Sequence, residues 1–317
     1  MSTMSYEINP LRVGAKHFPP ILNIGHRGAR AFAPENTLPA FEKAKTFGCQ
    51  MFELDVHRSK DGELIVHHDD ELTRCTDVDV KFPGRRTNFV SDFTYDELLQ
   101  LDAGSWYEQQ LQLSAEKRQS FLRTLTDEEI AQFVSLEDRQ FYKSGTITLP
   151  TLQQALAVAL EMDMMVNIEI KTIPRMYQGI ADAVVRLVET MGLDRRVLIS
   201  SFDHEQLLAV RKLNDVIATG VLTSDRLARP NDYLQLLDAD AYNPGCYGDY
   251  DSIGFDSVCR EIDSRGIVNV REGGRGVNVW TCNDRHQMQE LISAGVTGII
   301  TDFPNRARDI LRASGTQ

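Results

Sequence analysis

The chain has 317 residues, of which 42% are hydrophobic and 25% are charged. This is the composition of an ordinary globular protein, and it excludes the fibrous and intrinsically disordered classes. The 46 acidic and 34 basic side chains leave a formal net charge of -12, which disfavours nucleic acid as a partner. The length suits either two ordinary domains or one large barrel domain with insertions.

The sequence shows no sign of a membrane or secretory protein. No apolar run is long enough for a signal peptide or a membrane span, so we expect neither export nor a span. The five cysteines are widely spaced and form no Cys-x-x-Cys pair, so they indicate neither a disulfide framework nor a zinc knuckle. Reduced thiols predict a cytoplasmic location. The pattern does not indicate an oligomeric state.

Short apolar runs alternate with longer stretches of helical periodicity along the chain. The expected strands lie near residues 21–25, 51–56, 165–170, 197–201, 217–222, 239–243, 277–281 and 298–302. The expected helices lie near residues 36–48, 151–162, 176–190, 203–213, 226–237, 253–266, 284–294 and 305–313. This alternation predicts an α/β fold, a closed (β/α)8 TIM barrel that forms a single domain over residues 1–317. A doubly wound open sheet is the alternative, but no phosphate-binding glycine fingerprint follows the first strand.

The regular spacing is interrupted once, because about 110 residues separate the second and third expected strands. Asp61-Gly62 lies between two β-rich runs and predicts a hairpin after the second strand. The polar stretch at about 73–148 then predicts a small, partly helical insertion, with apolar residues at roughly helical spacing over 114–133. A connection after a barrel strand emerges at the catalytic end, so we expect the insertion to overhang the mouth and to control substrate access, not the chemistry.

Carboxylates recur on one face of two expected strands. Glu53 and Asp55 are two residues apart in the second strand, and Asn167, Glu169 and Lys171 alternate in the same way along the third. Three converging carboxylates suit a divalent cation such as Mg²⁺ or Ca²⁺, with Mn²⁺ a further candidate, and do not suit zinc. A network of salt bridges without a metal explains the same pattern equally well.

Two histidines stand where the same rim of the barrel is expected. His26 follows the first strand and His68 closes the hairpin after the second, so the two are candidates for a general acid and a general base. His57 and His67 are interpreted as structural neighbours. Arg27 follows His26 directly, and with Lys171 it would offset an anionic substrate, which indicates a phosphoester.

The run GHRGARAFAPENTLPAFEKAKTFGCQMFELDVHRSKDGELIVHHDDELTRCTD closely resembles the opening of the glycerophosphodiester phosphodiesterase family. The blocks HRG, PENT, ELDV, DG and HD occur in the family's order. The resemblance continues through LDAGSW, LPTLQQAL, NIEIK, SSFDHEQL, VNVWTCND and GVTGIITDFP, and so covers nearly the whole chain from about residue 20. Two stretches depart from the compact form of the family, residues 107–146 and 225–271, which leaves substrate preference open.

The resemblance implies roles for individual residues. Metal binding would fall to Glu53, Asp55 and Glu169, acid-base catalysis to His26 and His68, and phosphate binding to Arg27 and Lys171. We expect supporting roles for Asn36, as the cap of the helix that follows, for Glu35, which would orient Arg27, and for Asp69, as a metal ligand or a partner of His68. Trp280 is expected in the seventh strand, either as a wall of the substrate site or as a layer of the barrel.

These features predict a metal-dependent phosphodiesterase that hydrolyses a small glycerophosphodiester to glycerol 3-phosphate and an alcohol. One alternative is lysophospholipase D activity, with an apolar groove in the insertion. The candidate lining residues, which otherwise form the insertion's own core, are Phe82, Phe89, Phe93, Trp106, Phe121 and Phe133. The other alternative is a non-catalytic, ligand-sensing barrel, which would be expected to lack a histidine or carboxylate of these motifs, and none is missing.

Overall fold

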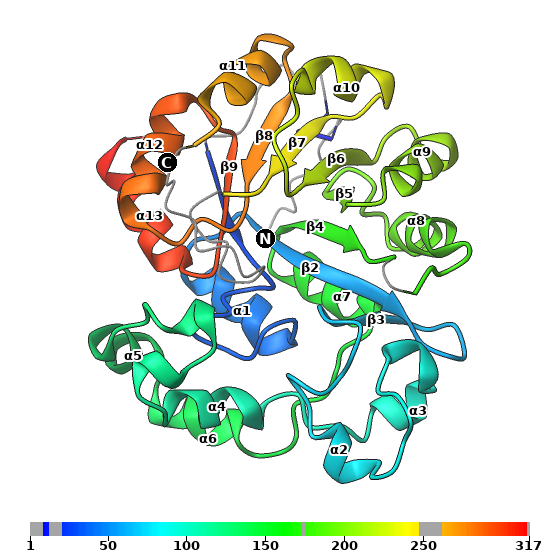
Figure 1. Ribbon diagram of the computed structural model, residues 1–317, viewed down its shortest axis with the longest axis vertical. Helices are drawn as coiled ribbons and strands as arrows, with labels where there is room; N and C mark the ends of the chain where they lie inside the picture. The colour runs from blue at the N-terminus through cyan, green and yellow to red at the C-terminus, as the bar shows by residue number, and fades with distance from the viewer. Residues whose placement is uncertain (1–8, 13–20, 173–174, 247–261, 316–317) are drawn as a thin grey trace.

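In a computed structural model, the chain forms a closed parallel barrel surrounded by helices (Figure 1). The structure describes residues 9–12, 21–172, 175–246 and 262–315. The sheet runs in the order β1-β9-β8-β7-β6-β5-β4-β2-β3, and a further pairing of β1 with β2 closes it. The barrel predicted from the alternating pattern is therefore confirmed, and the open doubly wound sheet is wrong.

The barrel strands lie within two residues of their expected positions at the start of each strand. They are β1 (Leu22–Gly25), β2 (Met51–Arg58), β4 (Met165–Ile170), β5 (Val197–Ser201), β6 (Ala218–Thr223), β7 (Ala241–Pro244), β8 (Gly276–Val279) and β9 (Gly298–Thr301). Strand β3 (Leu64–Val66) pairs with β2 antiparallel, and Gly62 in the turn has a φ of 100°. That conformation favours glycine, so the Asp-Gly hairpin forms for the expected reason.

The helices of the barrel alternate with its strands and pack around them. They are α1 (Leu38–Thr46), α7 (Leu152–Glu161), α8 (Ile180–Thr190), α9 (His204–Leu213), α10 (Pro230–Leu236), α11 (Ser264–Glu272), α12 (Arg285–Ala294) and α13 (Pro304–Ala313). Most of the helix expected at 253–266 falls outside the described residues. The helix of that unit, α11, begins at Ser264, where Asp263 caps it by accepting from the backbone N–H of Gly266.

The insertion consists of short helical pieces, which lie together at the bottom of the view in Figure 1. They are α2 (Val78–Lys81), η1 (Val90–Asp92), α3 (Tyr95–Leu98), α4 (Ser105–Leu111), η2 (Ala115–Lys117), η3 (Ser120–Leu122), α5 (Asp127–Phe133) and α6 (Leu136–Tyr142). The helical stretch expected over 114–133 is wrong in its first half, because only α5 is an α-helix. Arg118 is buried there and donates to the carbonyls of Leu113 and Leu125, which holds a compact turn, and Thr126 with Glu129 forms a capping box that starts α5 afresh.

The apolar side chains of the strands fill the space between the barrel and its helices. Ile168 and Ile170 belong to the large apolar cluster that includes α7 and α8 residues, which leaves the alternate positions of β4 facing the barrel interior. The opposite, N-terminal end of the barrel is closed by residues 9–12. Leu11 packs in the cluster with Leu22 and Met51, and the Asn9 amide donates to the carbonyl of Val197 at 3.0 Å.

Within the described residues, no helix is both long enough and apolar enough to cross a bilayer.

Candidate active site

A cavity of about 530 Å³ opens at the carboxyl ends of the barrel strands. Its volume lies within the range of about 300–1,000 Å³ that is usual for small-molecule sites. The barrel contributes charged and polar lining on one side, and Phe202, Leu222 and Trp280 add apolar lining. The insertion contributes Gln119, Ser120 and Phe121, so it does overhang the mouth as expected. The expected site residues that line the cavity are His26, Arg27, Glu53, His68, Asp69, Glu169, Lys171 and Trp280.

Glu53, Asp55 and Glu169 converge at the floor of this region. Each offers a carboxylate oxygen, and these three atoms lie within 4.8 Å of one another. The register explains the convergence, because Asp55 pairs directly with Glu169 across β2 and β4, and Glu53 is the next residue on the same face of β2. Burial raises the pKa of Glu53 well above its usual value, and the nearby carboxylates of Asp55 and Glu169 raise it further.

This cluster fits a divalent cation. Oxygen ligands on opposite sides of an ion lie about 4.2 Å apart for Mg²⁺ and about 4.8 Å apart for Ca²⁺, as expected from their bond lengths. Glu53 Oε2 accepts from the backbone N–H of Arg27 at 2.8 Å, whereas Glu53 Oε1 is buried and has no hydrogen-bond partner among the described residues. A buried carboxylate oxygen without a donor is costly, and a cation between the three residues would satisfy it.

Salt bridges also occur at the cluster, as the second interpretation of the sequence expected. Lys171 Nζ lies 2.8 Å from Glu169 Oε1 and 3.3 Å from Asp55 Oδ1. Arg27 Nε lies 3.6 Å from Asp55 Oδ2. These contacts leave Glu53 Oε1 without a donor, so the two cations do not fully neutralise the cluster, and the two interpretations are compatible. Burial opposes the charge on Lys171, but Glu169 and Asp55 outweigh it and raise the pKa of that ammonium group.

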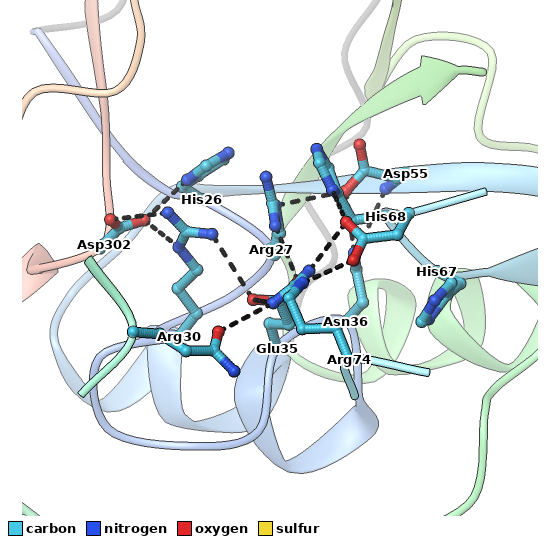
Figure 2. Close-up of polar contacts among 12 residues, drawn as sticks. His26, Arg27, Arg30, Glu35, Asn36, Asp55, His67, His68, Arg74 and Asp302 are labelled. Atoms are coloured by element: carbon cyan, nitrogen blue, oxygen red, sulfur yellow. Dashed lines mark hydrogen bonds and ion pairs between the residues drawn. The ribbon is translucent and has the colours of Figure 1, made fainter. Parts of the chain in front are cut away.

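His26 lies at the end of β1 with one ring nitrogen held by a carboxylate. Its Nδ1 is 2.7 Å from Oδ1 of Asp302, the residue directly after β9 (Figure 2). Its Nε2 is 4.0 Å from Glu53 Oε2. Burial lowers the pKa of His26 to about 4, with further lowering from Arg30 and Arg27, so the ring is neutral at pH 7. Asp302 remains ionised, because Arg30 and His26 hold its pKa below the usual range despite burial, so it accepts the Nδ1 proton and leaves Nε2 as the basic nitrogen.

His68 has the same arrangement with a different partner. Its Nδ1 is 2.6 Å from Asp69 Oδ1. Burial lowers the pKa of His68 well below its usual value, and the charges of Arg27 and Lys171 contribute. Asp69 therefore orients His68, and it is not among the carboxylates that converge on the candidate cation site. The expectation that Asp69 is either a ligand or a partner of His68 is resolved in favour of the partner.

The loop between β1 and α1 carries two of the expected supporting residues. Glu35 Oε1 accepts from Arg27 Nη1 at 2.7 Å, as expected. The expectation that Asn36 caps α1 is wrong, because Thr37 occupies the N-cap position. Asn36 instead adopts a φ of 56° and turns its amide to Asp55, donating from Nδ2 to Oδ2 at 2.8 Å.

Trp280 lies just beyond the end of β8, not within the strand as expected. Its indole Nε1 donates to the carbonyl of Asn243 at 2.8 Å, and the half-buried ring lines the cavity and meets Phe202 edge to face. Of the six aromatic residues considered for an apolar groove in the insertion, Phe121 alone lines the cavity. Phe82 meets Phe93 edge to face, and Phe133 meets Phe32 in the same way, so these rings pack against the apolar core.

Three polar residues of the site did not stand out in the sequence. They are Asp302, which contacts His26, and two arginines that bind the histidine partners. Arg30 Nη2 lies 3.0 Å from Asp302 Oδ2 (Figure 2). Arg74 Nε lies 2.5 Å from Asp69 Oδ2. A signal existed for Asp302, because it follows the last expected strand at the catalytic end of the barrel. The two arginines carry no comparable signal. The partner of Arg30 lies 272 positions away, and Arg74 and its partner Asp69 stand in a polar loop sequence with no distinguishing pattern.

Known proteins share both the sequence pattern and the fold. Residues 26–306 match the model of the glycerophosphoryl diester phosphodiesterase family. A glycerophosphodiester phosphodiesterase of Bacillus altitudinis is 32% identical over 284 residues, which are 89% of this chain and 94% of the relative. One from Caldanaerobacter subterraneus is 29% identical over 294 residues, 93% of this chain and 99% of the relative.

Solved structures agree in fold. A putative glycerophosphoryl diester phosphodiesterase from Silicibacter pomeroyi superposes with a TM-score of 0.72 at 22% identity, covering 96% of this chain and 97% of that one. A phosphodiesterase from Oleispira antarctica, solved with the product sn-glycerol-3-phosphate, gives a TM-score of 0.67 at 24% identity, covering 91% and 96%. The family match runs from His26 to α13, and the relatives align with this chain over most of their own length. The chain therefore belongs to the glycerophosphoryl diester phosphodiesterase family.

Proposed function

We propose that this enzyme hydrolyses glycerophosphodiesters to glycerol 3-phosphate and an alcohol, with a divalent cation and with His26 and His68 as its acid-base pair. One observation carries the proposal. One cavity is lined by Glu53 and Glu169 of the three-carboxylate cluster, by the cations Arg27 and Lys171, and by two histidines that each contact their own carboxylate. Family membership and the named activities of full-length relatives support the substrate class.

The charges suit a phosphodiester, which carries one negative charge. Arg27 and Lys171 flank the carboxylate cluster and would bind the non-bridging oxygens of the phosphate. Glu53, Asp55 and Glu169 would hold the cation, which supplies Lewis-acid stabilisation of charge that develops on the phosphoryl group. The positive charges of the cation, Arg27 and Lys171 would then be balanced by the negative charges of the substrate and the three carboxylates, so that no buried charge is left unpaired.

The two histidines would divide the proton transfers. In each ring the carboxylate at Nδ1 orients the imidazole and leaves Nε2 for exchange with the substrate. One histidine, with an unprotonated Nε2, would remove the proton of the attacking hydroxyl. The other would have to carry a proton on Nε2 as well as on Nδ1, which the negative phosphate beside it favours, and would donate the Nε2 proton to the leaving alkoxide. We favour attack by the neighbouring hydroxyl of the glycerol, because an intramolecular nucleophile has a high effective concentration. That step forms a cyclic phosphate and releases the alcohol, and water then opens the ring.

The test is an assay of the enzyme after chelation and after return of Mg²⁺, Ca²⁺ or Mn²⁺. Glycerol 3-phosphate release is measured from glycerophosphocholine, glycerophosphoethanolamine and glycerophosphoglycerol, and release of lysophosphatidic acid is measured from a lysophospholipid. We expect no turnover after chelation and restored turnover of the small diesters with at least one ion. Turnover of the lysophospholipid alone would overturn the proposal in favour of lysophospholipase D activity. Full activity after chelation would overturn the role of the cation.

The cellular location belongs to the same proposal. Cys49 and Cys75 are buried thiols, which is consistent with the expected cytoplasmic compartment.

A further inference from the structure

Each site histidine belongs to a chain of contacts that ends at the insertion. Asp302 binds His26 on one oxygen and receives two guanidinium donors from Arg30. Asp69 binds His68 and receives two donors from Arg74, from Nε at 2.5 Å and from Nη2 at 3.0 Å. Two hydrogen bonds from one guanidinium fix the plane of a carboxylate. Each arginine therefore fixes the orientation of its aspartate relative to the histidine ring.

Glu35 joins the two chains of contacts. Its carboxylate accepts from Arg74 Nη2 at 2.6 Å and lies 3.5 Å from Arg30 Nη1, while also binding Arg27 (Figure 2). Glu35 is 5% exposed, and its pKa is well below the usual value because the three guanidiniums overcome the effect of burial. The arginines thus have a common anchor on the barrel side.

Two further residues of the insertion contact the same two arginines. The ring of Phe121 lies 4.1 Å from the guanidinium carbon of Arg30, and Gln119 Oε1 accepts from Arg74 Nη1 at 3.1 Å. Both contacting residues come from one short turn, Gln119–Phe121, and all three residues of this turn line the cavity. An aromatic face attracts a guanidinium and excludes water from it, and a neutral acceptor binds one of its donors without removing its charge.

This turn is firmly held. Gln110 Oε1 accepts from the backbone N–H of Gln119 at 2.8 Å, and the buried Arg118 binds carbonyls on both sides of the turn. The insertion is docked on the barrel at some distance from the turn, where Glu129 binds Arg306 of α13. The position of Gln119 and Phe121 relative to the barrel is therefore determined by packing, as a positioning role requires.

We infer that the Gln119–Phe121 turn positions the two catalytic histidines, Phe121 through Arg30 and Asp302 to His26, and Gln119 through Arg74 and Asp69 to His68. The inference rests on the proposed function. It replaces the expectation that the insertion controls access alone. The insertion completes the active site without contributing a group that touches the reacting atoms.

The test is a set of double-mutant cycles on the full-length enzyme. Phe121→Leu removes the ring, and Gln119→Met removes the acceptor at nearly constant length. Each is combined with His26→Ala and with His68→Ala, and kcat and KM are measured for glycerophosphocholine. In the wild-type background we expect kcat to fall about tenfold for each turn variant with little change in KM, because small displacements of catalytic groups act on the chemical step.

The decisive result is selective non-additivity. The effect of Phe121→Leu should vanish in the His26→Ala background and persist in His68→Ala, and the effect of Gln119→Met should show the reverse pattern. Phe121→Tyr, which keeps the ring, should recover most of the lost turnover. Phe133→Leu and Gln109→Met are matched controls in the same insertion, because neither residue lines the cavity, and we expect them to retain wild-type kcat.

Equal losses in both histidine backgrounds would overturn the inference, since a merely structural defect is additive. Unchanged kcat in the wild-type background would overturn it as well. If Phe121→Leu fails to fold, Phe121→Met replaces it and must show the same selectivity. Near-normal turnover of both histidine variants would instead overturn the proposed function, and the two failures are therefore distinguishable.

Discussion

The side-chain amide of Asn36 donates to the carboxylate of Asp55 at 2.8 Å, although the two residues are 19 positions apart in sequence. The contact depends on a left-handed backbone at Asn36, with a φ of 56°, which asparagine tolerates better than most residues. The loop after β1 therefore orients a carboxylate in β2, and its backbone geometry contributes to the candidate cation site.

Substitution of Asn36 should weaken cation binding without removing a ligand. We expect Asn36→Gly and Asn36→Ala both to lose about 10- to 100-fold in affinity, the usual effect of deleting a group that orients a ligand. The glycine variant accepts the positive φ, so it should be the more stable of the two. Calorimetric titration with Mn²⁺ and urea unfolding measure the two effects. Unchanged affinity in both variants would contradict the orienting role.

Glu169→Gln should abolish tight cation binding and most of the activity while the barrel remains folded. Burial raises the pKa of Glu169, with the charge of Asp55 adding to the effect against the opposition of Lys171. Loss of one buried negative charge therefore leaves the cation-free protein with unfolding free energy equal to or above that of the wild type. Titration calorimetry and circular dichroism check the two parts, with the exposed Glu161→Gln as a control. Wild-type affinity in Glu169→Gln would show that the ligand assignment is wrong.

His26→Ala and His68→Ala should each lower kcat by about 100- to 10,000-fold with a modest change in KM, the usual contribution of general acid-base catalysis. A substrate with a nitrophenyl leaving group should restore turnover in the variant that lacks the acid, because such a leaving group needs no proton. The variant that lacks the base should show no such recovery. Steady-state kinetics on both substrates identify the acid and the base, and a variant that retains normal turnover would have no catalytic histidine at that position.

A fall in pH below neutral should destabilise the protein through the buried ring of His67. Burial lowers the pKa of His67 below the ordinary value of 6.5, so below that pH the unfolded chain binds a proton that the folded chain does not. The stability linked to His67 is thus complete above pH 6.5 and is lost as the pH falls towards the folded pKa. One such group contributes a slope of at most about 1.4 kcal/mol per pH unit.

Urea unfolding of the cation-free protein between pH 7 and pH 5 tests this linkage. His67→Gln should flatten the dependence of unfolding free energy on pH, and the exposed His286→Gln should leave it as in the wild type. Parallel curves for the wild type and His67→Gln would contradict the assignment of a buried neutral ring.

Loss of the Glu129 carboxylate should detach the insertion from α13. Glu129 binds both Arg306 and Asn305, and its partner Arg306 is 8% exposed. Glu129→Ala leaves a buried guanidinium with fewer acceptors, which costs about 3 kcal/mol when one partner of a buried pair is removed. Thermal unfolding compared with the exposed Glu128→Ala provides the measurement. Equal stability of the two variants would mean that this ion pair does not hold the insertion.

Periodicity predicted the barrel because each strand–helix unit repeats the same local pattern, and the parity of Glu53, Asp55 and Glu169 predicted their convergence once the strands were paired. The helices of the insertion were harder to predict. Apolar spacing suggested one helical stretch, but the buried Arg118 and the capping box at Thr126 divide it, and both act through side-chain contacts that periodicity does not record.

The same limitation explains the missed members of the site. Arg30 binds a carboxylate 272 positions away, and Arg74 meets Gln119 45 positions away, so neither contact has a local signature. Asn36 is a residue type that often caps helices and stands just before α1. Its positive φ, which the sequence does not reveal, directs its side-chain amide to Asp55 instead.

Closure of the barrel has a consequence for the order of folding during synthesis. Strand β1 pairs on one side with β2 and on the other with β9, whose last residue is Thr301. One edge of β1 therefore remains without its partner until β9 has left the ribosome, and the Asn9 amide has no access to the carbonyl of Val197 until β5 has been made. A nascent chain that stops before β9 exposes an open strand edge next to the loop of His26, so the catalytic rim is completed together with the barrel and not before it.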